Sequence, residues 1–345
     1  MRRTRAGHPA AVTVRTPLPH PFDREPFSVA AARAAGISAS RMRGGDLERP
    51  FYGVRGLPEA APAGETHAEA EQRLLLVTCR RYAPRLGADH FFSHETAARL
   101  WGCPLPGRFE PTESLHVSNP HRAVRTAGVI GHRVIAVTHG SRYELPVTGP
   151  ADTWLALAAH LELDDLVAAG DHLILDPRVL DPRDIRPHVA LEQLAERTKS
   201  FSGRGARTAA SALRLLRQGA ESRPETLVRL LLARAGFPEP ELQAEIRDDA
   251  GRLIGFADLF WPAMKVVVEY DGEHHRTNSV QYARDETRIE GFIEARNAVV
   301  RVRKGQLFRS PATVVARVER AFRRQASVVG LELPKSTCHQ IAEGR

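Results

Sequence analysis

The sequence contains little cysteine and no long apolar run. Its three cysteines, Cys79, Cys103 and Cys338, are widely spaced and form no C-x-x-C pair, which argues against a disulfide scaffold and against a cysteine zinc site. No stretch approaches the roughly 18 consecutive apolar residues of a transmembrane helix. No apolar segment follows the basic N-terminus, so a secretory signal is not expected either. These absences favour a cytoplasmic protein without a membrane partner.

Lysine is also scarce, whereas arginine is abundant. Four lysines stand among 49 basic residues, and the net charge is +8. The basic excess is concentrated in residues 1–20 and 198–326. A locally concentrated positive charge is typical of proteins that bind nucleic acid, so double-stranded DNA is the expected partner.

The composition changes along the chain predict an α+β protein of several domains. A length of 345 residues corresponds to about two or three domains. The predicted segments are a flexible basic arm (1–20), an N-terminal module (21–58), a Pro/Gly/Ala linker (59–70), a mixed α/β middle region (71–197), a basic linker (198–220), a C-terminal domain (221–326) and a tail (327–345).

The N-terminal module has the pattern of two short helices around a glycine turn. Ser28 and Ser38 can cap the helices, Gly36 can take the positive φ of the turn, and residues 47–54 alternate weakly, as in a hairpin. This order predicts a winged helix-turn-helix. Its expected DNA contacts are Ser38, Ser40, Arg41 and Arg43 on the recognition helix and Arg55 on the wing. The alternative is a small helical cap with solvated arginines.

The N-terminal part resembles a known family. The run from Phe27 to Ile37 and the segment Pro50-Phe51-Tyr52-Gly53-Val54 resemble the winged-helix domain of AbiEi-type antitoxins. The run from Phe92 to Gly102 looks like the middle region of related proteins. The resemblance covers roughly residues 20–170 and implies a protein that binds DNA and represses its own operon.

The middle region shows no catalytic set. Ser93 can cap a helix that contains His94, and a structural role is the expected one for that histidine. Asp164, Asp165 and Asp171 lie close together in sequence. We interpret them as residues of helix ends and of the surface.

Residues 221–326 alternate between helix and strand patterns. Pro224 suits the first turn of a helix that runs to residue 235. Strands are predicted at 241–247, 253–260 and 265–271, a long helix at 279–297, a strand at 299–303 and a helix at 311–324. The predicted order is therefore αβββαβα.

Carboxylates gather on two of these strands. Lys265, Glu269 and Asp271 share one face of the third strand by its period of two, and Asp258 on the preceding strand lies 11 residues before Glu269. Antiparallel pairing would bring Asp258 and Glu269 close together. Adjacent carboxylates repel each other unless a cation neutralises them, and oxygen ligands favour Mg²⁺ or Mn²⁺.

This pattern resembles the PD-(D/E)XK restriction-endonuclease-like superfamily, and within it a very-short-patch-repair (Vsr-like) endonuclease domain. The resemblance rests on the runs Ser222-Arg223-Pro224-Glu225-Thr226, Phe256-Ala257-Asp258, Val268-Glu269-Tyr270-Asp271-Gly272 with His274-His275, and Arg284-Asp285-Glu286-Thr287-Arg288. It implies a Mg²⁺-dependent DNA endonuclease in which Asp258 and Glu269 hold the metal and Glu225 adds a ligand directly or through water.

One position departs from that superfamily. It expects lysine two residues after the glutamate, where this chain has Asp271. Lys265 or His275 could substitute, Asp271 could hold a second metal, or the site could be weak or inactive. The alternative function is a non-enzymatic AbiEi-like regulator whose nuclease fold only binds DNA. An RNA substrate is a third possibility.

Overall fold

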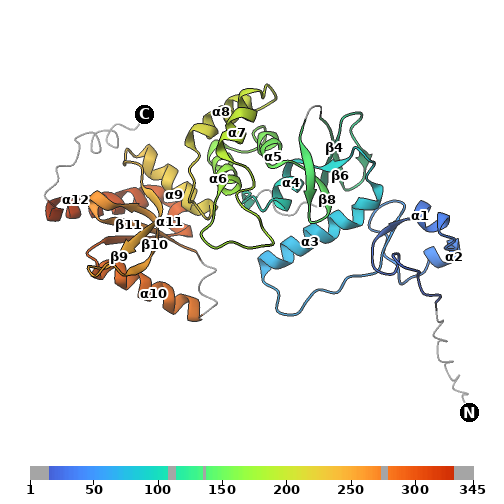
Figure 1. Ribbon diagram of the computed structural model, residues 1–345, viewed down its shortest axis with the longest axis horizontal. Coiled ribbons are helices and arrows are strands. Elements are labelled where there is room, and N and C mark those ends of the chain that lie inside the picture. The colour runs from blue at the N-terminus through green and yellow to red at the C-terminus, as the bar shows by residue number, and fades with distance from the viewer. Residues whose placement is uncertain (1–14, 108–113, 135–136, 273–278, 330–345) are drawn as a thin grey trace, which may run out of the picture. The chain divides into compact units, whose positions relative to one another are not determined.

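The computed structural model describes residues 15–107, 114–134, 137–272 and 279–329 (Figure 1). The chain forms two compact units. One comprises Met1–Leu100 with Pro111–Thr148, and the other comprises Trp101–Glu110 with Gly149–Arg345. The division at Thr148 falls inside the segment 71–197 that the sequence predicted to be one region. An α+β protein is confirmed.

The first unit begins with a small module of two helices and a two-stranded sheet. Its elements are β1 (Phe27–Ser28), α1 (Val29–Ala34), α2 (Ala39–Met42) and β2 (Val54–Arg55). As predicted, the Ser28 and Ser38 hydroxyls accept hydrogen bonds from backbone N–H groups in the first turns of α1 and α2, and Gly36 has a φ of +80°. The segment predicted as a hairpin at 47–54 folds back through an antiparallel bridge between Glu48 and Gly56, and β2 also pairs with β1, which precedes both helices.

The rest of the first unit is a six-stranded mixed sheet with two helices. Its elements are α3 (His67–Tyr82), β3 (Phe91–Phe92), α4 (His94–Leu100), β4 (Leu115–Asn119), β5 (Arg125–Thr126), β6 (Val129–Arg133), β7 (His139–Arg142) and β8 (Leu145–Thr148). The strand order is β5-β6-β4-β3-β8-β7. β4 and β6 are parallel neighbours, and α4 packs against β4.

The second unit begins with four helices: α5 (Pro150–Leu157), α6 (Leu163–Ile174), α7 (Leu191–Lys199) and α8 (Ala206–Leu215). The segment 198–220, predicted as a basic linker, contains α8 at its centre. Ala209 and Ala212 of α8 are completely buried. Burial of this apolar face stabilises a helix in a segment whose arginines had suggested a linker. In the described part of the chain, no helix is both long and apolar enough to cross a membrane.

The C-terminal elements follow the predicted αβββαβα order, with one additional short helix. They are α9 (Arg223–Arg234), β9 (Glu241–Arg247), β10 (Leu253–Trp261), β11 (Val266–Asp271), α10 (Ser279–Glu294), β12 (Ala298–Arg303), α11 (Lys304–Arg309) and α12 (Pro311–Val329). The helix α11 was not predicted, since Gly305 interrupts the apolar pattern there.

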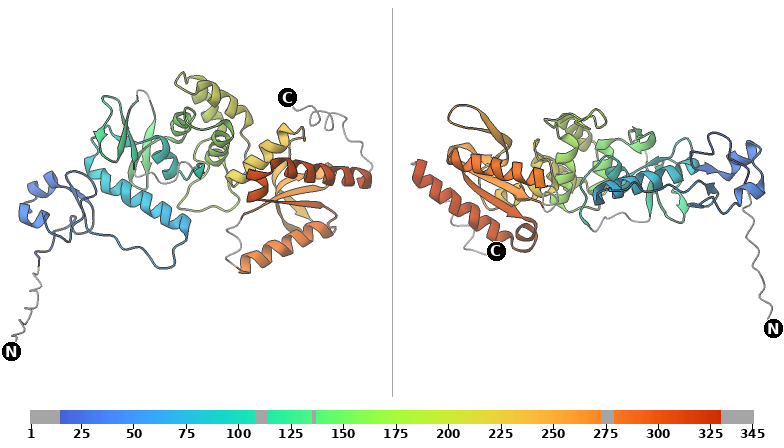
Figure 2. Two further views of the ribbon diagram at one scale, coloured as in Figure 1. Left: turned by 180° about the vertical axis from the view of Figure 1, so that it is seen from behind. Right: turned by 90° about the horizontal axis from the view of Figure 1, so that it is seen from below.

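The four C-terminal strands form one sheet in the order β12-β11-β10-β9, in which β11 and β12 are parallel. Helices α9 and α12 cover one face and α10 covers the other (Figures 1 and 2). Val266 and Val268 of β11 are buried under α9 and α12, whereas Val267 is buried with Phe292 of α10. Burial on both faces explains the unbroken valine run of this strand.

Candidate active site

Two predicted carboxylates meet where β10 and β11 run side by side. Leu259 pairs with Val268, which places Asp258 next to Glu269 across the strands. The backbone N–H of Asp258 donates a hydrogen bond to Oε1 of Glu269 at 3.1 Å. In return, Oδ2 of Asp258 accepts a hydrogen bond of 2.8 Å from the N–H of Tyr270. Each side chain is thus fixed by the backbone of the other strand.

Glu225 comes to the same place from α9. Ser222 caps the N-terminus of α9, and its hydroxyl donates a hydrogen bond of 2.7 Å to Oε1 of Glu225. The backbone N–H of Glu221 donates to Oε2 at 2.9 Å. Nε2 of Gln243 lies 3.5 Å from Oε2 of Glu225 and 3.4 Å from Oδ1 of Asp258. Gln243 therefore links the two carboxylates.

The sheet is irregular at this point. Leu242 and Leu259 pack in the core under α9 and α12, but Ile246 and Ala257 pack in the core under α10. The side chains of β9 and β10 thus exchange faces beside Gln243, whose φ of 48° is unusual for a residue other than glycine. Strained backbone of this kind is concentrated at functional sites.

The three carboxylates carry their charge at an energetic cost. Glu225 is 9% exposed and Glu269 is 4% exposed. Burial, together with the charge of Asp258, raises the pKa of both Glu225 and Glu269 to about 8. Burial also raises the pKa of Asp258, to about 6. Without a cation, protons neutralise part of this group at neutral pH.

Arg288 of α10, which belongs to one of the runs that carry the nuclease resemblance, adds a positive charge here. Its Nη1 lies 2.9 Å from Oε2 of Glu269 and donates a hydrogen bond of 2.6 Å to the Phe256 carbonyl. Arg288 also pairs with Asp285, three residues before it on α10, at 3.7 Å. The i, i+3 spacing by itself predicts only this local pair, so the contact with Glu269 depends on how α10 packs against the sheet.

Of the remaining predicted residues, Asp271 and Lys265 are placed away from these three carboxylates. Asp271 forms ion pairs with Arg301 at 3.2 Å and Arg303 at 3.5 Å, both on β12. Lys265 is exposed and precedes β11, which puts it about 13 Å along the strand from Glu269 at about 3.3 Å per residue. His275 lies outside the described residues.

The predicted DNA contacts divide into engaged and exposed residues. Arg41 donates hydrogen bonds to the Asp46 carboxylate and to the Thr16 carbonyl, so its guanidinium is occupied inside the module. Arg55 donates to the backbone carbonyls of Met42 and Val54. The remaining three predicted contacts, Ser38, Ser40 and Arg43, are exposed.

Further arginines surround a pocket of about 870 Å³ in the first unit. Arg33, Arg49 and Arg85 line it and are exposed, and Tyr52 on its edge is 86% exposed. Burial and the charge of Arg49 lower the pKa of Arg55. The module therefore carries a concentrated positive charge, although on partly different arginines from those predicted.

Comparison with known proteins gives relatives without a described function. Over 231 residues the chain is 26% identical to uncharacterized proteins of Mycobacterium tuberculosis strains CDC 1551 and H37Rv; the alignment covers 66% of this chain and 80% of each relative. No family model and no solved structure matches the chain. The resemblances to Vsr-like nucleases and AbiEi-type antitoxins therefore stay predictions.

Proposed function

We propose that the protein binds double-stranded DNA and that its C-terminal domain hydrolyses phosphodiester bonds with Mg²⁺ or Mn²⁺. The observation that carries this proposal is the meeting of Glu225, Asp258 and Glu269 from α9, β10 and β11. Buried carboxylates that raise one another's pKa are stabilised when a divalent cation replaces their protons.

The donor set fits a hard cation. Asp258 and Glu269 would hold Mg²⁺ or Mn²⁺, and Glu225 would add a ligand directly or through water, because carboxylate oxygens are the ligands these ions prefer. The bound ion would supply an activated water and neutralise charge in the transition state. Gln243 is placed to orient Glu225 and Asp258.

Arg288 provides the cation that the missing lysine would have supplied. Its Nη1 contacts Glu269 directly, so in the resting protein it offsets the charge of one metal ligand. With a divalent ion on Glu269, the guanidinium can turn to a phosphate oxygen, for which its planar fork is suited. An arginine stays protonated and cannot act as the general base.

In this proposal the exposed arginines of the first unit bind the DNA backbone. Arg33, Arg43, Arg49 and Arg85 are exposed, and the phosphate contacts of such side chains provide most of the affinity of non-specific binding. The resemblance to AbiEi-type winged helices supports the same assignment.

A plasmid-nicking assay with Mg²⁺ and Mn²⁺ tests the enzyme. We expect cleavage by the wild type and its loss in Asp258→Asn and in Glu269→Gln, which preserve shape but remove charge. Asp249→Asn is the matched control, since Asp249 is exposed in the turn between β9 and β10. Cleavage that persists in both site variants would locate the activity elsewhere or in a contaminant.

The second candidate function is a non-enzymatic DNA-binding regulator. The Arg288–Glu269 contact favours it, because an internal cation already offsets one of the carboxylates. The wild type would then bind DNA without cleaving it. Mg²⁺ would lower its affinity for DNA only through competition for the phosphates and would not raise its thermal stability.

A further inference from the structure

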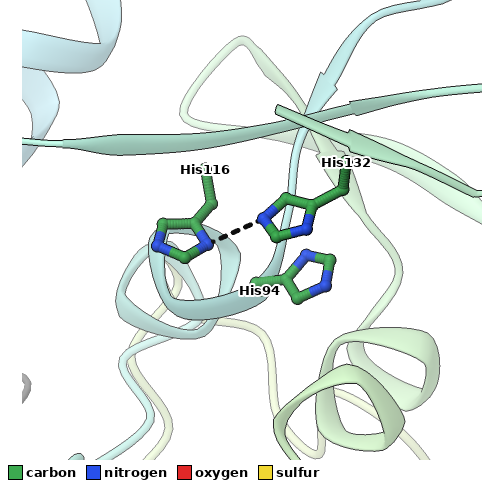
Figure 3. A group of neighbouring side chains, drawn as sticks. All are labelled: His94, His116 and His132. Atoms are coloured by element: carbon green, nitrogen blue, oxygen red, sulfur yellow. Dashed lines mark hydrogen bonds between the residues drawn. The ribbon is translucent and has the colours of Figure 1, made fainter. Parts of the chain in front are cut away.

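Three histidines of the first unit meet in space although they are far apart in sequence. His94 begins α4, His116 lies on β4 and His132 lies on β6. One ring nitrogen of each lies within 4.8 Å of one from both others. Figure 3 shows His116 and His132 facing each other through their ring nitrogens, with His94 beside His132.

The separations approach those of a coordinated ion. Nδ1 of His116 lies 3.0 Å from Nε2 of His132. Zn–N distances of about 2.0–2.1 Å place neighbouring donors of a tetrahedral site roughly 3.3 Å apart. The rings of His94 and His132 are stacked, with centroids 3.6 Å apart and planes at 15°. Because imidazole lone pairs lie in the ring plane, one of these two rings must turn about its Cβ–Cγ bond to face a shared ion.

Polar groups also contact the histidines. Oε2 of Glu95 lies 2.8 Å from Nδ1 of His116, the nitrogen that faces His132, so this carboxylate lies on the side of the ring where an ion would bind. The hydroxyl of Ser93 lies 3.0 Å from Nδ1 of His94 and accepts a hydrogen bond from Ser118 at 2.6 Å. A Ser93 oxygen that also accepts from His94 Nδ1–H leaves Nε2 of that ring as the lone-pair donor.

The charge and the backbone support the same conclusion. Oε2 of Glu95 is buried and lies beside the His116 ring, so a carboxylate charge at this point can offset part of the charge of a divalent ion. His94 has a φ of 48°, a strained conformation that the capping of a helix by Ser93 does not itself require.

We propose that His94, His116 and His132 bind a divalent first-row transition-metal ion, for which Zn²⁺ is the probe. Three imidazoles suit Zn²⁺, and a set of three protein nitrogens leaves a fourth position for water or another ligand. The ion would join α4 to β4 and β6. This site lies in the first unit and is independent of the carboxylates in the C-terminal domain.

The test is Zn²⁺ binding to the full chain after removal of metal by a chelator. Isothermal titration would use the Asp258→Asn, Glu269→Gln double variant, so that the carboxylate group does not contribute. We expect about one Zn²⁺ per chain in that background. His132→Gln and His94→Gln should weaken binding at least tenfold. His121→Gln is the control, because His121 belongs to the same unit but has a side chain that is 77% exposed and paired with Asp89.

A second measurement reports the ligands themselves. Co²⁺ added to the metal-free protein should give the visible absorption of a low-symmetry site with nitrogen ligands, and His116→Gln should remove it. Circular dichroism of each variant establishes that it is folded. The proposal is overturned if the folded background chain binds no Zn²⁺, or if the His94→Gln and His132→Gln variants bind it as tightly as the His121→Gln control. Neither result depends on whether the C-terminal domain cleaves DNA.

Discussion

The backbone N–H of Asp258 donates a hydrogen bond to the side chain of Glu269, 3.1 Å away on the neighbouring strand. This contact fixes the glutamate at the point where the sheet becomes irregular, and it holds two acidic side chains together against their repulsion. Glu225 approaches the pair from α9. The first two predictions follow from the raised pKa values of the buried carboxylates in this group.

Affinity for Mg²⁺ should rise with pH. The pKa values of Glu225 and Glu269 are raised to about 8 by burial and by Asp258. Below that pH the ion must displace protons, so affinity should fall by up to about tenfold per pH unit for each proton displaced. Calorimetric titration from pH 6 to pH 9, in two buffers of different ionisation heat, measures the affinity and the protons released. A constant affinity across this range would contradict the prediction.

Glu225→Gln should stabilise the metal-free protein at high pH. The pKa of this carboxyl is about 4.5 in the unfolded chain but about 8 in the folded chain. Between these values the folded state keeps a proton that the unfolded state has lost, so wild-type stability falls as pH rises and the loss is complete above about 8. We expect the variant to gain on the order of 1–3 kcal/mol at pH 9, and little at pH 4.5 or below.

Chemical denaturation at the two pH values measures this difference. The control is Glu241→Gln, because Glu241 is exposed at the start of β9. The same Glu225 variant should lose part of the stabilisation that Mg²⁺ gives the wild type, because Asp258 and Glu269 remain to bind the ion. An equal effect of the substitution at both pH values would show that the pKa of Glu225 is not raised in the folded protein.

Arg43→Ala combined with Arg49→Ala should weaken binding to duplex DNA. Both side chains are exposed, and the removal of each phosphate contact should reduce the slope of log affinity against log salt by about 1. Fluorescence anisotropy over a salt series measures this slope. Arg309→Ala, which removes an exposed arginine from the second unit, should leave affinity nearly unchanged. An equal weakening of binding in the double variant and in the control would exclude the module as the specific contact surface.

Arg41→Ala should instead act on stability. Its Nη2 lies 2.7 Å from Asp46 and its Nε donates to the Thr16 carbonyl, and the side chain is 12% exposed. We expect thermal unfolding to shift to lower temperature by the equivalent of about 1–2 kcal/mol, and DNA affinity of the remaining folded protein to change little. A large drop in affinity with unchanged unfolding would restore Arg41 as a DNA contact.

Asp171→Asn should be strongly destabilising. Asp171 was predicted to be a surface residue, but its side chain and that of Arg229 are each 1% exposed and lie 3.0 Å apart. Thr226 also donates to Asp171, at 2.9 Å. Removing one charge of a buried pair costs about 3–5 kcal/mol. The control, Asp164→Asn, breaks a pair with the half-exposed Arg234 and should cost less than about 1 kcal/mol. Denaturant unfolding compares the two variants.

The sequence was sufficient where the signal is local. The serine caps of α1 and α2, the glycine turn and the alternation of helices and strands in the C-terminal domain depend on residues within a few positions of one another. Pairing of adjacent antiparallel strands also depends on local turns, so the neighbourhood of Asp258 and Glu269 could be predicted from a separation of 11 residues.

Only the tertiary structure decided the contacts between distant elements. Arg288 reaches Glu269 because α10 packs across the sheet. The pairing of β2 with β1 encloses both short helices, and α8 replaces a predicted linker because its alanines are buried by neighbouring helices. The three histidines come from a helix and two strands whose spacing in sequence is irregular. Contacts of this kind follow from how complete elements bury their apolar faces, which no short sequence pattern records.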